Sequence, residues 1–179
     1  MSKHHFILDI GHANGTGARS LNKAHEEHNL VTRIVSAAKS LLEGKGHTVT
    51  VLDFPEKNNT QDLNSTITAA NAVVGATCGI SFHMDAAESE SAKGAHVCYY
   101  STNGQKVATA IANKIITLLP GRANKTVKRD NLAVLKKTKP TWVLVECGFI
   151  TNPHDCTIAV EHPEWIAKEI VDGLLSYYV

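Results

Sequence analysis

Short apolar runs alternate along this chain with longer segments in which apolar residues recur at helical spacing. The runs have the length and composition of buried strands, and glycine, proline or polar loops separate them from the helical segments. Strands that alternate with helices are typical of a layered α/β domain. With 179 residues, the chain is long enough for a single sizeable core, so we expect one domain over residues 1–179.

The expected elements follow from this alternation. Strands are predicted over residues 6–10, 47–54, 78–83, 95–100, 132–135 and 142–147. Helices are predicted over about residues 25–43, 62–74, 105–119 and 163–178. Gly44 and Gly46 supply the stop signal of the first helix, and Pro120-Gly121 supplies that of the third.

Three of these strands carry a metal-ligand or proton-transfer residue near their carboxyl ends. His12 follows the first strand, His83 ends the third, and Glu146 interrupts the otherwise apolar run 142–147. Ligands and catalytic groups of open α/β sheets lie at this edge. Alone, each histidine could be a loop cap or a satisfied core histidine, and Glu146 could belong to a buried ion pair. Their parallel placement favours a shared metal site with a general base, and hence a hydrolase.

A further candidate ligand lies in the segment His25-Glu26-Glu27-His28. Only two residues separate its histidines, so the segment is not an HExxH zinc motif. At helical spacing, Glu27 points along the centre of the apolar stripe that follows it, while Glu26 points to the edge. A core-facing carboxylate has to be paired or metal-bound. The alternative is an exposed first-turn glutamate that favours the helix N-terminus.

The remaining histidines and charged residues give weaker indications of function. His96, in a predicted strand, is kept as an alternative site residue. The net charge of +1 gives no reason to expect nucleic acid or an acidic membrane surface as a partner. The basic segment 125–139 has no interleaved aromatic residues and is expected to be a solvated surface whose charges could touch a carboxylate-bearing substrate.

The four cysteines show no CxxC pairing, which favours a reduced, cytoplasmic place of synthesis. The first strand starts almost at Met1, and no apolar stretch has the length of a membrane span. We therefore expect synthesis in the cytoplasm without a signal peptide, and no membrane insertion.

These residues give the chain a resemblance, over nearly its whole length, to zinc-dependent N-acetylmuramoyl-L-alanine amidases of the type 3 family, which includes phage endolysins and bacterial autolysins. Five motifs carry it in the order of the family: Asp9-Ile10-Gly11-His12, Glu27 with Leu30, Ser81-Phe82-His83-Met84-Asp85-Ala86, Gly94 to Tyr100, and Leu144 to Asn152.

Three positions depart from the family pattern. Ile10 replaces a frequent proline, Ala13-Asn14 replaces the usual glycines, and Asp85 replaces an asparagine. None of them is a predicted ligand.

The resemblance implies a single α/β domain with a twisted, mostly parallel sheet of about six strands and helices on both faces. It also implies one Zn²⁺ per chain, held by His12, Glu27 and His83, with Glu146 as the general base. The substrate would be peptidoglycan, cut between N-acetylmuramic acid and the L-alanine of the stem peptide. The protein would act on the cell wall after release from the cytoplasm.

Two alternatives stay open at this point. A zinc peptidase acting on stem peptides would use the same metal site. A non-hydrolytic module of the same fold would bind cell-wall fragments, but it would be favoured by loss of Glu146 or of a ligand, and none is lost. The oligomeric state does not follow from the sequence.

Overall fold

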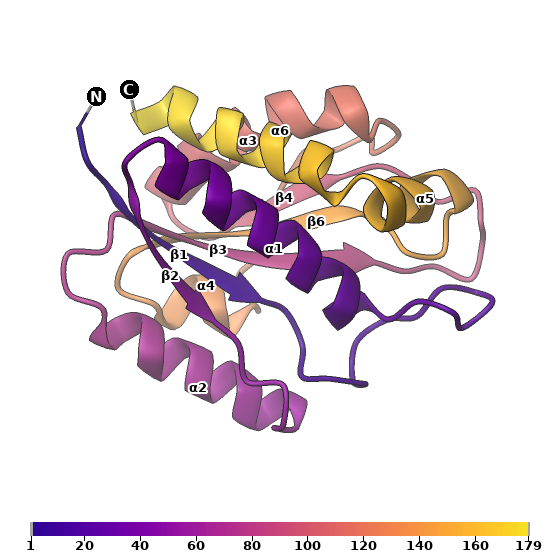
Figure 1. Cartoon of the computed structure of the whole chain (residues 1–179), viewed down its shortest axis with the longest axis horizontal. Coiled ribbons are helices and arrows are strands. Elements are labelled where there is room, and N and C mark those ends of the chain that lie inside the picture. The colour runs from indigo at the N-terminus through magenta and orange to yellow at the C-terminus, as the bar shows by residue number, and fades with distance from the viewer. Residues whose placement is uncertain (1, 179) are drawn as a thin grey trace.

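A six-stranded sheet runs through the middle of the molecule, with helices against both of its faces (Figure 1). The computed structural model describes residues 2–178. The strands are β1 (His5–Ile10), β2 (Thr48–Leu52), β3 (Cys78–Asp85), β4 (His96–Tyr99), β5 (Thr126–Lys128) and β6 (Thr141–Phe149). The helices are α1 (Glu27–Gly44), α2 (Asn59–Ala72), α3 (Thr102–Leu118), α4 (Ala133–Lys137), α5 (Pro153–Glu161) and α6 (Pro163–Tyr178).

The order of the strands across the sheet is β2-β1-β3-β6-β4-β5. Strands β2, β1, β3 and β6 are mutually parallel, whereas β4 is antiparallel to β6 and β5 is parallel to β4. The carboxyl ends of β1, β3 and β6 therefore meet the amino end of β4 at one edge of the sheet. This edge carries the candidate site.

Each face of the sheet has its own apolar core. Helices α1, α3 and α6 cover one face, and α2 and α4 cover the other (Figure 1). Successive strand residues point to opposite faces. Because Val143 and Val145 belong to the first core and Leu144 to the second, Glu146 lies on the face of α2 and α4.

The predicted α/β class and most predicted elements are confirmed, with boundaries shifted by a few residues. The predicted strand over residues 132–135 is wrong, because Leu132 caps the short helix α4 and residues 133–135 belong to it. Val134 and Leu135 are buried in the second core. A short apolar run cannot be assigned to a strand or a buried helix from its pattern alone. Strand β5 and helix α5 were not predicted.

The four cysteines are free and buried. Within residues 2–178, no helix combines the length and apolar character that crossing a membrane requires.

A buried carboxylate fastens the loop before β4 to the end of β6. Asp155, in the first turn of α5, is fully buried. Its Oδ2 accepts hydrogen bonds from the backbone N–H groups of Gly94 at 2.7 Å and Phe149 at 3.0 Å. One side chain therefore joins three segments next to the candidate site.

We expect Asp155→Ala to lower the free energy of unfolding by about 2–5 kcal/mol, because it leaves two buried N–H donors without an acceptor. Urea denaturation measures this difference. Asp172→Ala is the control, since Asp172 pairs with Lys168 at the surface, and it should leave the midpoint nearly unchanged. Equal midpoints for the two variants would contradict this role of Asp155.

Candidate active site

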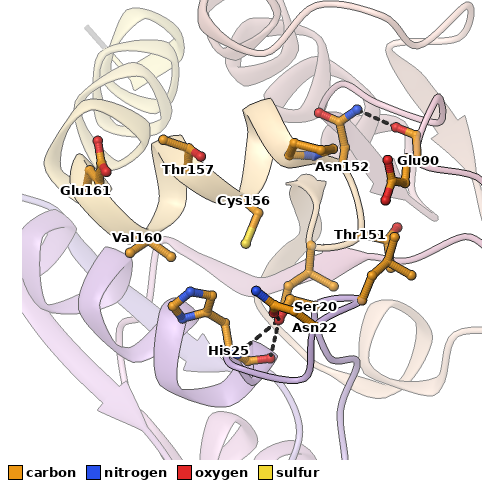
Figure 2. A pocket seen from close by; sticks show the side chains of 13 residues that line it. Ser20, Asn22, His25, Glu90, Thr151, Asn152, Cys156, Thr157, Val160 and Glu161 are labelled. Carbon is orange, nitrogen blue, oxygen red and sulfur yellow. Dashed lines mark hydrogen bonds between the residues drawn. The ribbon is translucent and has the colours of Figure 1, made fainter.

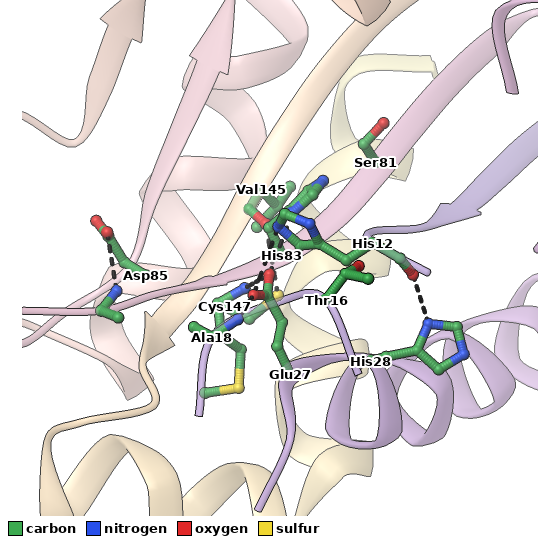
Figure 3. A network of polar contacts seen from close by, with 12 residues as sticks. His12, Thr16, Ala18, Glu27, His28, Ser81, His83, Asp85, Val145 and Cys147 are labelled. Carbon is green, nitrogen blue, oxygen red and sulfur yellow. Dashed lines mark hydrogen bonds and ion pairs between the residues drawn. The ribbon is translucent and has the colours of Figure 1, made fainter. Parts of the chain in front are cut away.

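Three predicted ligands converge at the carboxyl edge of the sheet. His12 follows β1, His83 lies near the end of β3, and Glu27 is the first residue of α1. The ligand atoms of these residues all lie within 4.8 Å of one another. Figure 3 shows Glu27 extending towards the ring of His83, with His12 beside it. The structure therefore brings together residues from three segments that are far apart in the sequence.

Glu27 is the most buried member of this cluster, with 2% of its surface exposed. Its Oε1 lies 3.1 Å from His83 Nδ1 and accepts a hydrogen bond from the Met84 N–H at 2.9 Å. Its Oε2 accepts from the Ala18 N–H at 2.8 Å and lies 3.6 Å from His12 Nε2. The carboxylate thus stays charged inside the protein because donors surround it.

The structure confirms the predicted orientation of the first helix. Glu26 keeps 23% of its side chain exposed and forms an ion pair with Arg19, which is also at the surface. Glu27, one residue later, is buried against the sheet edge. The apolar stripe of α1 therefore distinguishes two chemically identical neighbours.

The electrostatics of the cluster favour a positive charge between these residues. Burial alone raises the pKa of Glu27, but the hydrogen bond and charge of His83, with His12 nearby, bring it below its usual value. Burial alone lowers the pKa of His83, but Glu27 and then Glu146 raise it to about 9. Such an environment stabilises a proton or another cation.

Close packing fixes the position of the His83 ring. A Cβ atom on Gly11 would collide with this ring, so only glycine fits there. The next residue, His12, has φ 61°, a left-handed conformation that residues with a side chain rarely adopt. Its Nδ1 lies 3.2 Å from Asn59 Oδ1, and this contact leaves Nε2 towards Glu27. The turn after β1 is therefore shaped to present His12.

Glu146 lies beside the cluster, on β6. Its Cα pairs with that of His83 on β3 and with that of His96 on β4. Oε2 of Glu146 is buried and, among the described residues, has no hydrogen-bond partner. Burial, followed by the opposing charge of His83 and the repulsion of Asp85, leaves its pKa raised to about 7. Glu146 can therefore gain and lose a proton near neutral pH.

His96, the alternative site residue, is the neighbour of Glu146 on the side away from His83. It is 2% exposed, and its Nδ1 lies 4.0 Å from Asp85 Oδ2. Burial and then the charge of Arg122 lower the pKa of His96 to about 4. His96 is therefore neutral near pH 7 and less suited than Glu146 to take a proton.

Two buried carboxylates near the cluster were not predicted as site residues. Asp9 accepts hydrogen bonds from Ser81 at 2.6 Å and Thr66 at 2.9 Å. Burial, and then the charge of Asp9, raise the pKa of Asp62 to about 6. Both line a cavity of about 100 Å³ together with His12 and His83. The signal for Asp9 was its position inside an apolar run, the same signal that identified Glu146.

A separate pocket of about 370 Å³ lies between the loop before α1 and helix α5 (Figure 2). Ser20, Asn22 and His25 line one side, and Cys156 and Val160 line the other. None of the four candidate site residues lines this pocket, so it lies outside the cluster.

The family follows from a match to residues 6–176, nearly the whole chain, by the model for N-acetylmuramoyl-L-alanine amidase. The chain belongs to this amidase family. Curated relatives are named probable cell wall amidase LytH. The protein from Staphylococcus saprophyticus is 30% identical over 96% of this chain and 57% of its own length. The protein from Staphylococcus aureus is 28% identical over the same shares. The amidase chain thus spans little more than half of these relatives.

Solved structures share the fold. The catalytic domain of the CD27L endolysin, which targets Clostridia Difficile, has a TM-score of 0.87 at 28% identity over 97% of each chain. The CwlD amidase from Clostridioides difficile, solved with the GerS lipoprotein, has a TM-score of 0.89 over 98% of each chain. Its identity of 24% shows the fold alone. The family resemblance inferred from five motifs is confirmed, while the roles of the four site residues of this amidase stay predictions.

The cluster makes the stability of the metal-free amidase depend on pH. The folded pKa of His83, about 9, lies above its ordinary 6.5. Its contribution is therefore fully present below about pH 6.5 and is lost as the pH rises through about 9. We expect urea denaturation with a chelator to show lower stability at about pH 9 than at about pH 6.

His83→Gln should flatten this decline, because the titrating group is gone. Glu146, whose pKa of about 7 is raised from 4.5, destabilises the fold as the pH rises from about 4.5 to 7, so it contributes little above pH 7. A variant that kept the full decline between about pH 7 and 9 would contradict the assignment to His83.

Proposed function

We propose that this chain hydrolyses the amide bond between the lactyl group of N-acetylmuramic acid and the L-alanine of the peptidoglycan stem peptide. One zinc ion held by His12, Glu27 and His83 would assist the reaction. The observation that carries the proposal is the convergence of two histidines and a buried carboxylate beside a proton carrier, Glu146. Membership of the amidase family and relatives named cell wall amidase support the substrate.

The residues present fit a catalytic zinc ion. Two imidazoles and one carboxylate are a ligand set that catalytic zinc uses, with a further position left for water or substrate. The raised pKa of His83 and the lowered pKa of Glu27 show that the cluster favours a positive charge. The contact of His12 with Asn59 is the kind of outer contact that orients a metal-binding imidazole.

A zinc ion held by His12, Glu27 and His83 would polarise the amide carbonyl and would lower the pKa of a water molecule to about 7. The chain's own residues supply the rest of the chemistry. Glu146, whose buried Oε2 has no hydrogen-bond partner within residues 2–178, would accept the proton of the attacking water. It would then deliver this proton to the departing amine, which is not expelled as an anion. A pKa of about 7 suits both transfers.

Product analysis of digested peptidoglycan tests the reaction directly. We expect mass spectrometry to find released peptides with a free L-alanine amino group and intact glycan strands. This outcome follows because only the amide bond between sugar and peptide is cut. New reducing sugar ends would instead identify a glycosidase, and cuts confined to the stem would identify a zinc peptidase. Peptidoglycan that shows no new end of any kind after incubation with the zinc-loaded chain would instead support the non-hydrolytic binding module.

Replacement of Glu146 by Gln tests the proton carrier. The substitution keeps the volume but removes the proton acceptor, so turnover should fall roughly 10²–10⁴-fold while zinc binding survives. Single-turnover kinetics and metal analysis on one preparation measure both quantities. Near-normal turnover would move the general base elsewhere, and His96→Gln would be the next variant to measure.

The neighbouring pair Glu26 and Glu27 gives a matched test of the metal site. Glu27→Ala should sharply weaken zinc binding in calorimetry, because it removes one of three protein ligands. Glu26→Ala loses only a surface pair with Arg19, so it should change stability by about 0.5 kcal/mol at most and keep the metal. Loss of zinc from Glu26→Ala but not from Glu27→Ala would reverse the assignment.

A further inference from the structure

A basic pocket lies on the same face of the sheet as Glu146, beyond β4. Lys93, Arg122 and Arg129 line it, and its volume is about 430 Å³. Val127 of β5, which also lines the pocket, belongs to the core on the face of α2 and α4. Strand alternation places Arg129 on that face as well, and its N–H continues the ladder by donating to Tyr99 at 2.8 Å.

A short chain of contacts connects the basic pocket to Glu146. Arg122 Nη2 lies 3.9 Å from Asp85 Oδ2, which in turn lies 4.0 Å from His96 Nδ1. His96 is the strand neighbour of Glu146. Across the sheet, β5 is two strand spacings, about 10 Å, from β6, which is the span of two to three residues of extended peptide. The backbone of Arg129 also lies further along β4 than His96, since Lys128 pairs with Tyr99, but the charge of Arg129 still acts on His96. The pocket is thus within reach of a substrate whose scissile bond lies at Glu146.

The positive charges of the basic pocket are only weakly compensated. Within residues 2–178, Arg122 has one ion pair, the long one with Asp85, and neither Lys93 nor Arg129 has any. Lys93 and Arg129 are exposed, whereas Arg122 is half-buried with its guanidinium over the ring of Phe149. Guanidinium groups held in this way bind carboxylates through two parallel hydrogen bonds.

We propose that Lys93, Arg122 and Arg129 form a subsite that binds a carboxylate on the peptide part of the substrate, two or three residues from the scissile amide. The inference rests on the proposed amidase function and adds a recognition element to it. A carboxylate fits better than an uncharged group, because three cations and no carboxylate of the described residues line the pocket, and of these cations only Arg122 pairs with Asp85.

Two soluble substrates test the subsite. Both are N-acetylmuramoyl-L-alanyl tripeptides, one with free carboxylates at the second and third residues and one with carboxamides there. We expect kcat/KM of the zinc-loaded, unmodified chain to be about tenfold higher for the free carboxylates. Arg129→Gln should bring this ratio close to one, mainly through KM. Because Arg129 is exposed, the variant should fold, and Lys93→Gln provides a second exposed position.

Lys106→Gln is the matched control. Lys106 is exposed on α3, on the opposite face of the sheet, and the substitution makes the same change in charge. It should keep the preference for carboxylates. Three results would each overturn the subsite. The unmodified chain could show equal kcat/KM for the two substrates, Arg129→Gln could keep the full preference for carboxylates, or Lys106→Gln could lose that preference as much as Arg129→Gln does. Failure to cleave either substrate would overturn the proposed function as well, whereas equal cleavage of both overturns the subsite alone.

Discussion

The buried carboxylate of Glu27 is the constraint around which the rest of the site is arranged. A desolvated charge is stable in a protein only where donors and opposite charges meet it. Glu27 accepts hydrogen bonds from the Ala18 N–H of the preceding loop and from the Met84 N–H of β3, and it contacts the imidazole of His83. The start of α1, the loop before it and the end of β3 are therefore held in one arrangement. His12 completes that arrangement through the turn that only Gly11 permits.

Two glutamates on different elements acquire opposite properties from their surroundings. Glu27 has donors on both oxygens, and its pKa is lowered although it is nearly fully buried. Glu146 has a buried oxygen without a partner among the described residues, and its pKa is raised to about 7. A carboxylate that stays ionised is suited to bind a metal, whereas one that titrates near neutrality is suited to carry a proton. The two glutamates have the same side chain, so the hydrogen-bond donors around each one determine which of these two roles it suits.

Local sequence pattern was sufficient for the residues whose position depends on one element. The apolar stripe distinguished Glu27 from Glu26, and strand ends identified His12 and His83. The local sequence pattern was insufficient for predicting which residues lie next to each other when that depends on the order of strands in the sheet. The neighbours of Glu146 on the side of β4 follow from an antiparallel pairing between strands distant in the chain. The strand prediction for residues 132–135 failed for another reason. In so short an apolar run, burial against α2 and β6 decides between strand and helix.

The position of Asp85 allows a positive pocket and a high-pKa glutamate to lie close together. The charge of Arg122 lowers the pKa of Glu146, whereas the charge of Asp85 raises it. These two groups lie 3.9 Å apart, and Asp85 has the larger effect on Glu146, while burial is the largest cause of its raised pKa and His83 opposes it. An isolated arginine cluster at this distance would hold Glu146 ionised and make it a weaker base. The pairing with Asp85 therefore lets the basic pocket attract an anion while Glu146 stays able to exchange its proton near neutral pH.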